Sequence, residues 1–534
     1  MERLTRQIAF GAGCVLAIAG IAAAQGRGAG GWTTEGNDAQ RTSSVASDPQ
    51  ISVANMEKPG FKFLWKVKAN NEARQGASLS QALILDRYIG YRGFRSYAFF
   101  GGTSNNAVTL DTDLGRIEWS RHFDAPASPA GTAACPGGMT SGISRPTAIS
   151  EAPAAAAAGG GGRRGAAAES AVGKPGEGAV QVAAALAAAS GGRAGGRGGR
   201  GGARPGPFPG NSLFAITSDG MLRMVLISNG EDSAPPVRFL PANANATGLI
   251  FTEDDAFVAT RNNCGGAPNG VWAINLTDKT VHTWKTNGGS AIGTAFAPDG
   301  TVFASTGDGE YGATSFSDSV VALDPKDLHL KDQFSPGKSE FTTAPVVFNQ
   351  GGRDLVAVAN KDGKIYLLDA KSLGGADHKT PLAVSTAVGN VITGDLSTFE
   401  AGGTRWILAP VAGGMNSATH FAGINGAVTN GAVAAFKVVD QGGKPALEPA
   451  WVSRDLTNPL TSLIINGVVF ATSAGNSQRP AVLYALDGAS GKELWNSGGT
   501  ITSYSRAPVS GSASQMYLST ADSTIYTFGF ELVK

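Results

Sequence analysis

The chain has 534 residues, of which 42% are hydrophobic, only 16% are charged and 75 are glycine. A formal net charge of +1 argues against a polyanionic partner such as nucleic acid, because bulk electrostatics would not attract one. Many glycines among many short apolar runs are typical of an all-β protein that is rich in turns.

The first 24 residues are predicted to be a signal peptide. Arg3 and Arg6 precede an apolar stretch at 8–21, and three alanines at 22–24 offer a cleavage site. The stretch is short for a transmembrane helix, although a retained anchor is the alternative reading. We therefore expect a periplasmic or secreted mature chain without a transmembrane segment, beginning with an N-terminal extension over residues 25–60.

A repeat then fills most of the chain. It consists of an apolar strand, a polar turn, a second strand that ends in Leu-Asp or similar, a glycine turn and an aromatic strand. The copies contain residues 107–119, 225–227, 272–275, 321–324, 366–369, 434–436, 482–495 and 526–528. Repeats of roughly 40 to 50 residues suit propeller blades, so eight copies predict an eight-bladed β-propeller over 61–534, with four antiparallel strands per blade.

Three further features follow from this pattern. The aspartate that ends the second strand is predicted to be structural, because a short carboxylate can accept backbone N–H groups in the next turn. The strand at 61–67 is expected to pair with strands at 501–530, which closes the ring and removes its free edges. Residues 152–209 are low-complexity Ala, Gly, Arg and Pro, and we predict a disordered insertion in the second blade.

The start of the mature chain gives the first family-specific sign. The segment from Trp32 to Arg41, followed by Ile51-Ser-Val-Ala-Asn55, resembles the opening of the alcohol dehydrogenases that depend on pyrroloquinoline quinone (PQQ). The resemblance implies that PQQ, with a calcium ion, would lie on the propeller axis. The face of the propeller that binds the cofactor would be built by the loops after the second and fourth strands of each blade.

The resemblance also assigns candidate site residues. Ile292 occupies the position of the tryptophan that stacks under the quinone, and Asp308, with Glu310 nearby, replaces an asparagine that binds calcium. Glu340 is the only carboxylate near the position of the catalytic aspartate, and Lys361 matches the cation that contacts the quinone oxygens. The alternatives are a polar turn around Asp308 and a solvated lysine in a hairpin at position 361.

Cysteines complete the sequence picture. The family's pair of adjacent cysteines is absent; Cys135 and Cys264 fall in loops of the same predicted face, where they can form a disulfide or remain unrelated thiols. No Cys-x-x-Cys-His motif occurs, so no haem of its own is expected.

Two functions remain open. One is a PQQ- and calcium-dependent dehydrogenase with a reworked site. The other is a non-catalytic propeller that binds a small molecule or a protein through its loop face, as does the lipoprotein propeller of outer-membrane protein assembly, which shares these repeats.

Overall fold

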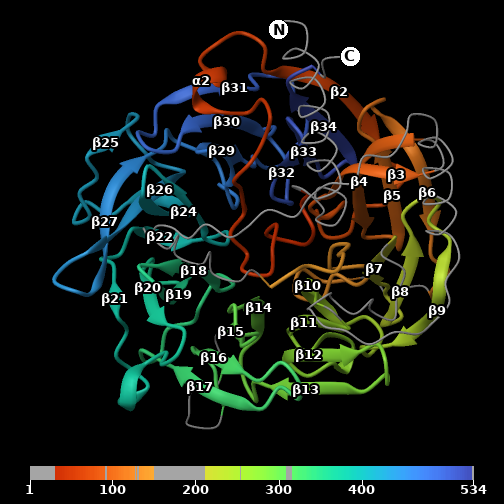
Figure 1. Cartoon of the computed structure of the whole chain (residues 1–534), viewed down its shortest axis with the longest axis horizontal. Helices are drawn as coiled ribbons and strands as arrows, with labels where there is room; N and C mark the ends of the chain where they lie inside the picture. The colour runs from red at the N-terminus through yellow and green to blue at the C-terminus, as the bar shows by residue number, and fades with distance from the viewer. Residues whose placement is uncertain are drawn as a thin grey trace, which may run out of the picture. The chain divides into compact units, whose positions relative to one another are not determined.

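A computed structural model describes residues 31–90, 93–126, 128, 131–149, 211–252, 254–307, 309 and 315–531. The chain divides into two compact units, and all described residues belong to the unit formed by 1–152 and 207–534. The predicted signal peptide and the whole of the predicted insertion lie outside the described residues. Within the described unit, antiparallel sheets form a ring of eight blades, which confirms the predicted propeller (Figure 1).

The strands are assigned to blades in chain order. Blade 1 contains β3 (Leu83–Gly90), β4 (Gly93–Gly102), β5 (Asn106–Asp111) and β6 (Arg116–His122), and blade 2 contains β7 (Ser212–Ile216), β8 (Met221–Leu226) and β9 (Asp232–Arg238). Blade 3 contains β10 (Asn245–Thr252), β11 (Asp255–Arg261), β12 (Gly270–Asn275) and β13 (Val281–Lys285), and blade 4 contains β14 (Ala291–Phe296), β15 (Val302–Thr306), β16 (Val320–Leu323) and β17 (Leu330–Phe334). In blade 2 an extended segment that bridges Ser144 to Phe214 takes the innermost place.

The other half of the ring follows the same plan. Blade 5 contains β18 (Val346–Gln350), β19 (Arg353–Ala359), β20 (Ile365–Asp369) and β21 (Ala383–Val384). Blade 6 contains β22 (Gly389–Ile392), β23 (Ser397–Ala401), β24 (Thr404–Met415), β25 (Gly423–Ile424), β26 (Gly431–Asp440) and β27 (Pro445–Val452). Blade 7 contains β28 (Leu463–Ile465), β29 (Val468–Ser473), β30 (Val482–Asp487) and β31 (Glu493–Asn496), and blade 8 contains β32 (Ser510–Ser512), β33 (Gln515–Ser519), β34 (Thr524–Gly529) and β2 (Lys62–Lys68). Short helices are α2 (Val53–Met56), η1 (Cys264–Gly266) and η2 (Gly375–Asp377).

Ring closure occurs as the sequence predicts. Strand β2 pairs antiparallel with β34, with Lys62 opposite Gly529 and Lys68 opposite Thr524. The first strand of the repeat region thus becomes the outer strand of blade 8. Pairing the first strand with the last joins the two ends of the chain within one sheet, so that the ring is closed by backbone hydrogen bonds.

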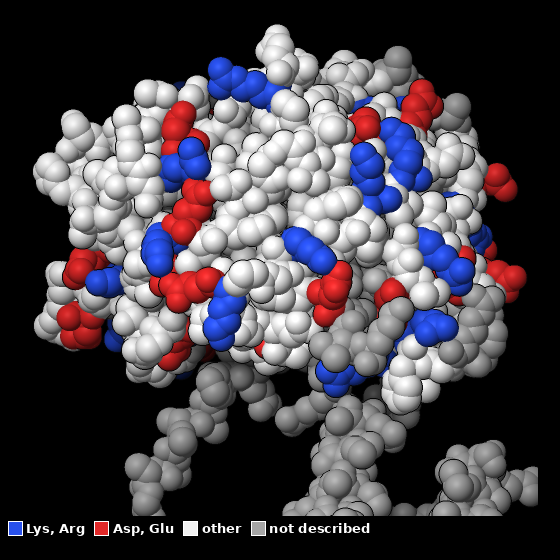
Figure 2. All heavy atoms as spheres, turned by 90° about the horizontal axis from the view of Figure 1, so that it is seen from above, with Lys and Arg blue, Asp and Glu red and all other residues white. Residues whose placement is uncertain are grey.

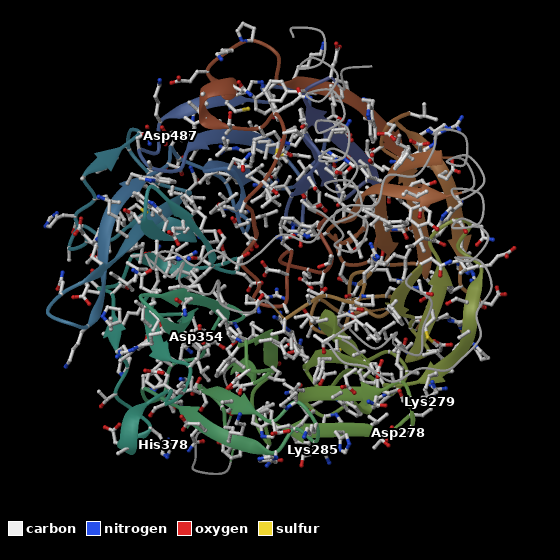
Figure 3. The ribbon with its side chains drawn as sticks, viewed as in Figure 1. Asp278, Lys279, Lys285, Asp354, His378 and Asp487 are labelled. Atoms are coloured by element: carbon white, nitrogen blue, oxygen red, sulfur yellow. A yellow bond between two sulfur atoms is a disulfide. The ribbon has the colours of Figure 1, made fainter. Side chains whose placement is uncertain are left out.

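The aspartates of the repeat are structural, as predicted. Oδ1 of Asp487 accepts backbone hydrogen bonds from Ala489 and Ser490. Asp369 accepts one from Lys371 in the same turn of blade 5. Figure 3 shows Asp487 in the outer part of the ring, away from its centre. These carboxylates therefore build turns and leave the axis to other residues.

The glycine and the aromatic residue of the repeat meet between neighbouring blades. Gly491 has φ +74°, and a Cβ on it would lie 2.7 Å from Trp451 Cδ2 of the preceding blade. Nε1 of Trp451 also donates to the Gly488 carbonyl at 2.9 Å. Gly230 and Trp119 form the same pair between blades 1 and 2. Only glycine admits both the backbone angle and the close indole ring.

The apolar core lies between the blades. Each cluster of buried side chains draws on neighbouring sheets; one joins blades 2 and 3, where Phe214 stacks on Phe251 with ring centroids 4.0 Å apart. Phe257 and Phe296 meet edge-to-face between blades 3 and 4 at 5.0 Å. Burying each of these side chains contributes roughly 1.5–3 kcal/mol, and neither face of a blade is buried without its neighbours.

The N-terminal segment, residues 32–51, crosses the middle of the ring and contacts the blades in order (Figure 1). Its successive backbone or side-chain partners are Ile84, Arg145, Leu249, Phe296, Val347, Thr398, Ile464 and Ser514, one from each blade or the connection that leads into it. This single segment thus forms hydrogen bonds with all eight blades or the connections that lead into them.

Charges on the outer surface are mixed. On the side drawn in Figure 2, acidic and basic side chains are interspersed among a majority of uncharged residues. No single-sign field that would steer a polyanion is visible on that side, in keeping with the net charge of +1.

Candidate functional site

The candidate site lies on the face formed by the connections after the second and fourth strands of each blade, which we call the upper face. Glu340 lies in the connection from β17 to β18, and Lys361 lies in the turn between β19 and β20. The Lys361 backbone N–H donates to the Glu340 carbonyl at 2.9 Å. Lys361 Nζ lies 3.7 Å from Glu340 Oε1, so the structure brings the predicted base and the predicted cation together.

Neighbouring polar groups fix this pair of loops. The Ser339 hydroxyl donates to Asp362 Oδ2 at 2.5 Å, and the buried Asn360 amide donates to Ser339 Oγ at 2.9 Å. The loop that carries Glu340 is thus bonded to the turn that carries Lys361. Since the Glu340 and Lys361 side chains are 33% and 42% exposed, the ion pair itself adds little stability, and its geometry comes from the backbone around it.

Ile292 lies on the same side of the ring, as the second residue of β14, and is half-buried. Gly307 separates it from Glu340: a Cβ on Gly307 would lie 3.5 Å from Ile292 Cδ1 and 3.8 Å from Glu340 Oε2. Both distances are ordinary contacts, so a glycine at 307 leaves a space bounded by an apolar side chain and a carboxylate. Ile292 and Glu340 therefore flank Gly307, and Lys361 is linked to them through its ion pair with Glu340.

A disulfide lies on the upper face beside this region. Cys135 and Cys264 are bonded, with Cα atoms 5.5 Å apart, so of the two alternatives left open by the sequence the structure selects pairing. The bond fixes residues 131–143, which we call the strap, to blade 3. Asn262 strengthens the attachment by donating to the Ala134 carbonyl at 2.7 Å, and its own backbone N–H is bonded to Ser290 Oγ.

Beneath the upper face, buried charges meet on the axis. Arg41 of the N-terminal segment donates from Nη2 to Asp395 Oδ2 at 2.6 Å and lies 3.9 Å from Glu35 Oε1. Burial lowers the pKa of Arg41, but the two carboxylates outweigh burial and leave it raised. Burial raises the pKa of Asp395, but the charge of Arg41 and the N–H of Ala344 leave it lowered. The pair is therefore held ionised.

A second guanidinium joins this cluster. Arg261 Nη2 donates to the carbonyl of Ile292 at 2.5 Å, and burial lowers the pKa of Arg261 despite the nearby Asp395 and Glu35. Nε of Arg261 and Nε and Nη1 of Arg41 have no hydrogen-bond partner among the described residues. N–H groups without a partner among the described residues thus lie near the backbone carbonyl of Ile292.

The predicted metal ligands cannot be placed. Asp308 and Glu310 both lie outside the described residues. Among the described residues, one group could hold an ion by the spacing of its ligand atoms: Asp324, Asp327 and His329. Those residues surround the turn between the third and fourth strands of blade 4, on the side away from the upper face, and Asp327 and His329 are exposed. This group is unrelated to the candidate site.

Comparisons with known proteins define the class at the level of the fold. No protein-family model and no curated protein matches the chain. Among solved structures, the quinohaemoprotein alcohol dehydrogenase of Comamonas testosteroni aligns with a TM-score of 0.59 and 13% identity, covering 96% of this chain and 82% of that one. The chain therefore has the propeller fold of the quinoprotein dehydrogenases, as the sequence resemblance implies.

Two further structures agree. A quinohaemoprotein alcohol dehydrogenase from Pseudomonas putida HK5 aligns with a TM-score of 0.59 and 13% identity over 95% of this chain and 81% of that one. A europium-containing methanol dehydrogenase aligns with a TM-score of 0.54 and 10% identity over 94% and 98%. At these identities the likeness establishes the fold alone. In the part of the chain that the structure describes, no helix is long and apolar enough to cross a membrane.

Sequence reasoning missed the axial charge cluster. Arg41 was noticed only as part of the opening motif, and Asp395 lies 354 residues further along the chain. Arg261 at the end of β11 carried no motif. Neither buried arginine has a local sequence signal, since Asp395 and Ile292, to which Arg41 and Arg261 donate, lie far from them in the sequence.

Proposed function

We propose that the upper face of this propeller binds PQQ near its axis and that the chain is a quinoprotein-type oxidoreductase with a reworked site. One observation carries the proposal: Ile292 of β14 and Glu340 of the β17–β18 connection flank Gly307, and Lys361 forms an ion pair with Glu340. The fold shared with two proteins that are named as alcohol dehydrogenases supports the reaction class.

The charges of the site fit such a ligand. PQQ is a flat tricarboxylate. The Lys361 ammonium and the N–H groups of Arg41 and Arg261 that lack a partner among the described residues are cationic hydrogen-bond donors suited to carboxylates. The apolar side chain of Ile292 offers a surface to a ring, although it lacks the aromatic face that makes stacking strong. Asp308 and Glu310 are the residues that would hold calcium, since both offer the oxygen ligands that this ion prefers.

Each residue then has a role. When bound, PQQ supplies the two-electron acceptor. Glu340, next to Gly307, would accept the hydroxyl proton of an alcohol. Lys361 orients Glu340 through the 3.7 Å ion pair and keeps a positive charge beside the ligand oxygens.

The disulfide supports action outside the cytoplasm, because disulfides persist in oxidising compartments. We accordingly propose that the protein is exported to the periplasm or beyond, as its first 24 residues predict.

A dye-linked assay with PQQ, calcium and short alcohols or aldehydes tests the reaction. Glu340→Gln keeps the size of the side chain and removes the base, so the rate should fall by about 10²–10⁴-fold. The matched control is Glu448→Gln, since Glu448 also faces a lysine, Lys437, at 3.9 Å but lies in blade 6 away from the site. Equal rates in both variants would remove Glu340 from the reaction.

The replacement of a stacking ring by Ile292 favours a second candidate, a non-catalytic propeller that binds a protein partner through the upper face. Restoring the ring separates the two. Ile292→Trp should tighten PQQ binding if the space holds the quinone, and it should leave PQQ binding undetectable if the face has no quinone site.

A further inference from the structure

A second cavity lies on the upper face, under the strap, and nothing above assigns it a function. Its volume is about 190 Å³. Its walls come from the strap, from the connections into blades 1 and 8, and from the start of β10 in blade 3. Pockets for drug-sized ligands run from about 300 to 1,000 Å³, so this cavity suits a smaller molecule.

The strap, which forms part of the cavity wall, is held firmly. Besides the Cys135–Cys264 bond, the Ala134 carbonyl accepts a hydrogen bond from Asn245 Nδ2 at 3.0 Å, and Thr140 Oγ1 accepts the backbone N–H of Ala246 at 2.8 Å. At the other end, Gln75 donates to the carbonyl of Gly131 at 2.6 Å. The strap thus spans from blade 1 to blade 3 and is bonded at both ends, so the space under it is preorganised for a ligand.

One buried hydroxyl in the wall lacks a partner. Ser141 is 3% exposed, and its Oγ makes no hydrogen bond to any described residue. A buried hydroxyl without a partner costs roughly as much as a lost hydrogen bond, and such groups are rare in native proteins. Ser141 lines the cavity, so a ligand with a hydroxyl or carboxylate there would satisfy it.

One cation completes the site. Arg506 lines the cavity and is exposed; its guanidinium lies 5.7 Å from the centre of the Tyr504 ring. No described carboxylate forms an ion pair with Arg506, and no lining residue is acidic. Met139 and Leu79 supply apolar wall. The lining therefore matches a small molecule with one carboxylate, hydroxyl groups and a short carbon chain.

We propose that the cavity under the strap binds a small hydroxycarboxylate, with its carboxylate on Arg506 and a hydroxyl on Ser141. This site is separate from the one around Gly307 and needs neither PQQ nor calcium. An arginine recognises a carboxylate through paired N–H donors, and the buried serine adds a contact that a simple fatty acid cannot use.

Calorimetric titration of the full protein, without PQQ or calcium, tests the proposal with three six-carbon probes. Gluconate carries both features, glucitol lacks the carboxylate, and hexanoate lacks the hydroxyls. Gluconate should bind about tenfold or more tightly than either, since a hydrogen bond to a charged group is worth about 1.5–3 kcal/mol, and 1.4 kcal/mol is tenfold. Equal or undetectable binding of all three would overturn the proposal.

Variants assign the residues. Arg506→Gln and Ser141→Ala should each weaken gluconate binding about tenfold. The controls are Arg454→Gln, whose guanidinium also lies over a tyrosine ring, and Ser397→Ala, which removes another buried hydroxyl without a partner. Both controls, and Lys361→Ala in the other site, should bind gluconate as the wild type does. Unchanged affinity in Arg506→Gln and Ser141→Ala would place the ligand elsewhere.

Discussion

Among the charged contacts of the described residues, we expect the axial ion pair between Arg41 and Asp395 to contribute most to the free energy of unfolding. Arg41→Met keeps an apolar stem of similar length but leaves the Asp395 carboxylate with the Ala344 N–H as its remaining hydrogen-bond donor among the described residues. Two unit charges 4 Å apart attract by about 4 kcal/mol at an effective dielectric constant of 20. Removing one partner of a fully buried pair typically costs 3–5 kcal/mol. Because the Asp395 side chain is 25% exposed, we expect a loss near the lower end of that range.

Urea unfolding of Arg41→Met, followed by tryptophan fluorescence, measures this loss. The control is Arg353→Met, because Arg353 faces Asp369 at 3.7 Å but is 47% exposed, and exposed pairs contribute about 0–1 kcal/mol. The double variant Arg41→Met/Asp395→Leu removes both charges and should recover part of the stability. The reasoning is refuted if Arg41→Met and Arg353→Met lower stability equally, since the N-terminal segment would then not be held by its charge.

Three other predictions follow from the same contacts. The folded-state pKa of Asp395 is lowered, so its contribution is present above the unfolded pKa of about 3.9 and is lost as pH falls through the folded value; the difference in melting temperature between wild type and Asp395→Asn should shrink from pH 7 to pH 3. The Cys135–Cys264 bond closes a loop of 129 residues, for which chain entropy allows up to about 5 kcal/mol; replacing both cysteines with serine should lower the urea midpoint, and reductant should then have no further effect. Gly491→Ala should cost more than Gly442→Ala in the same unfolding assay, because both have φ near +70° but only Gly491 abuts an indole ring; equal costs would remove the glycine–tryptophan contact from the account.

The ring could be predicted from sequence because each blade is local. The aspartate at 487 and the glycine at 491 lie within a few residues of each other, and a related pattern recurs along the chain, clearly in some copies and weakly in those at 225–227, 434–436 and 526–528. The closing strand at 61–67 was predictable for the same reason, since an aromatic strand without its own repeat needs a partner at the far end of the chain.

The site was only partly predictable. Lys361 could be predicted because it matches the family's cation, and Glu340 because it is the only carboxylate near the position of the family's aspartate; their backbone contact confirms that they meet. The pairing of Cys135 with Cys264 stayed open because the two loops are brought together only by the ring. The axial contact of Arg41 with Asp395 joins the first described residues to blade 6, and no pattern along the chain specifies which blade an inserted segment will meet.

The most direct test of the central claim is a titration of the purified protein with PQQ in the presence of calcium, followed by quinone absorbance and heat. The account predicts saturable binding that is weakened about tenfold or more by Lys361→Ala, because a charged contact to the ligand is lost. Lys364→Ala, an exposed lysine of the same turn, should bind as the wild type does. Absence of binding at high micromolar PQQ, or equal binding by both variants, would contradict a quinone site around Gly307.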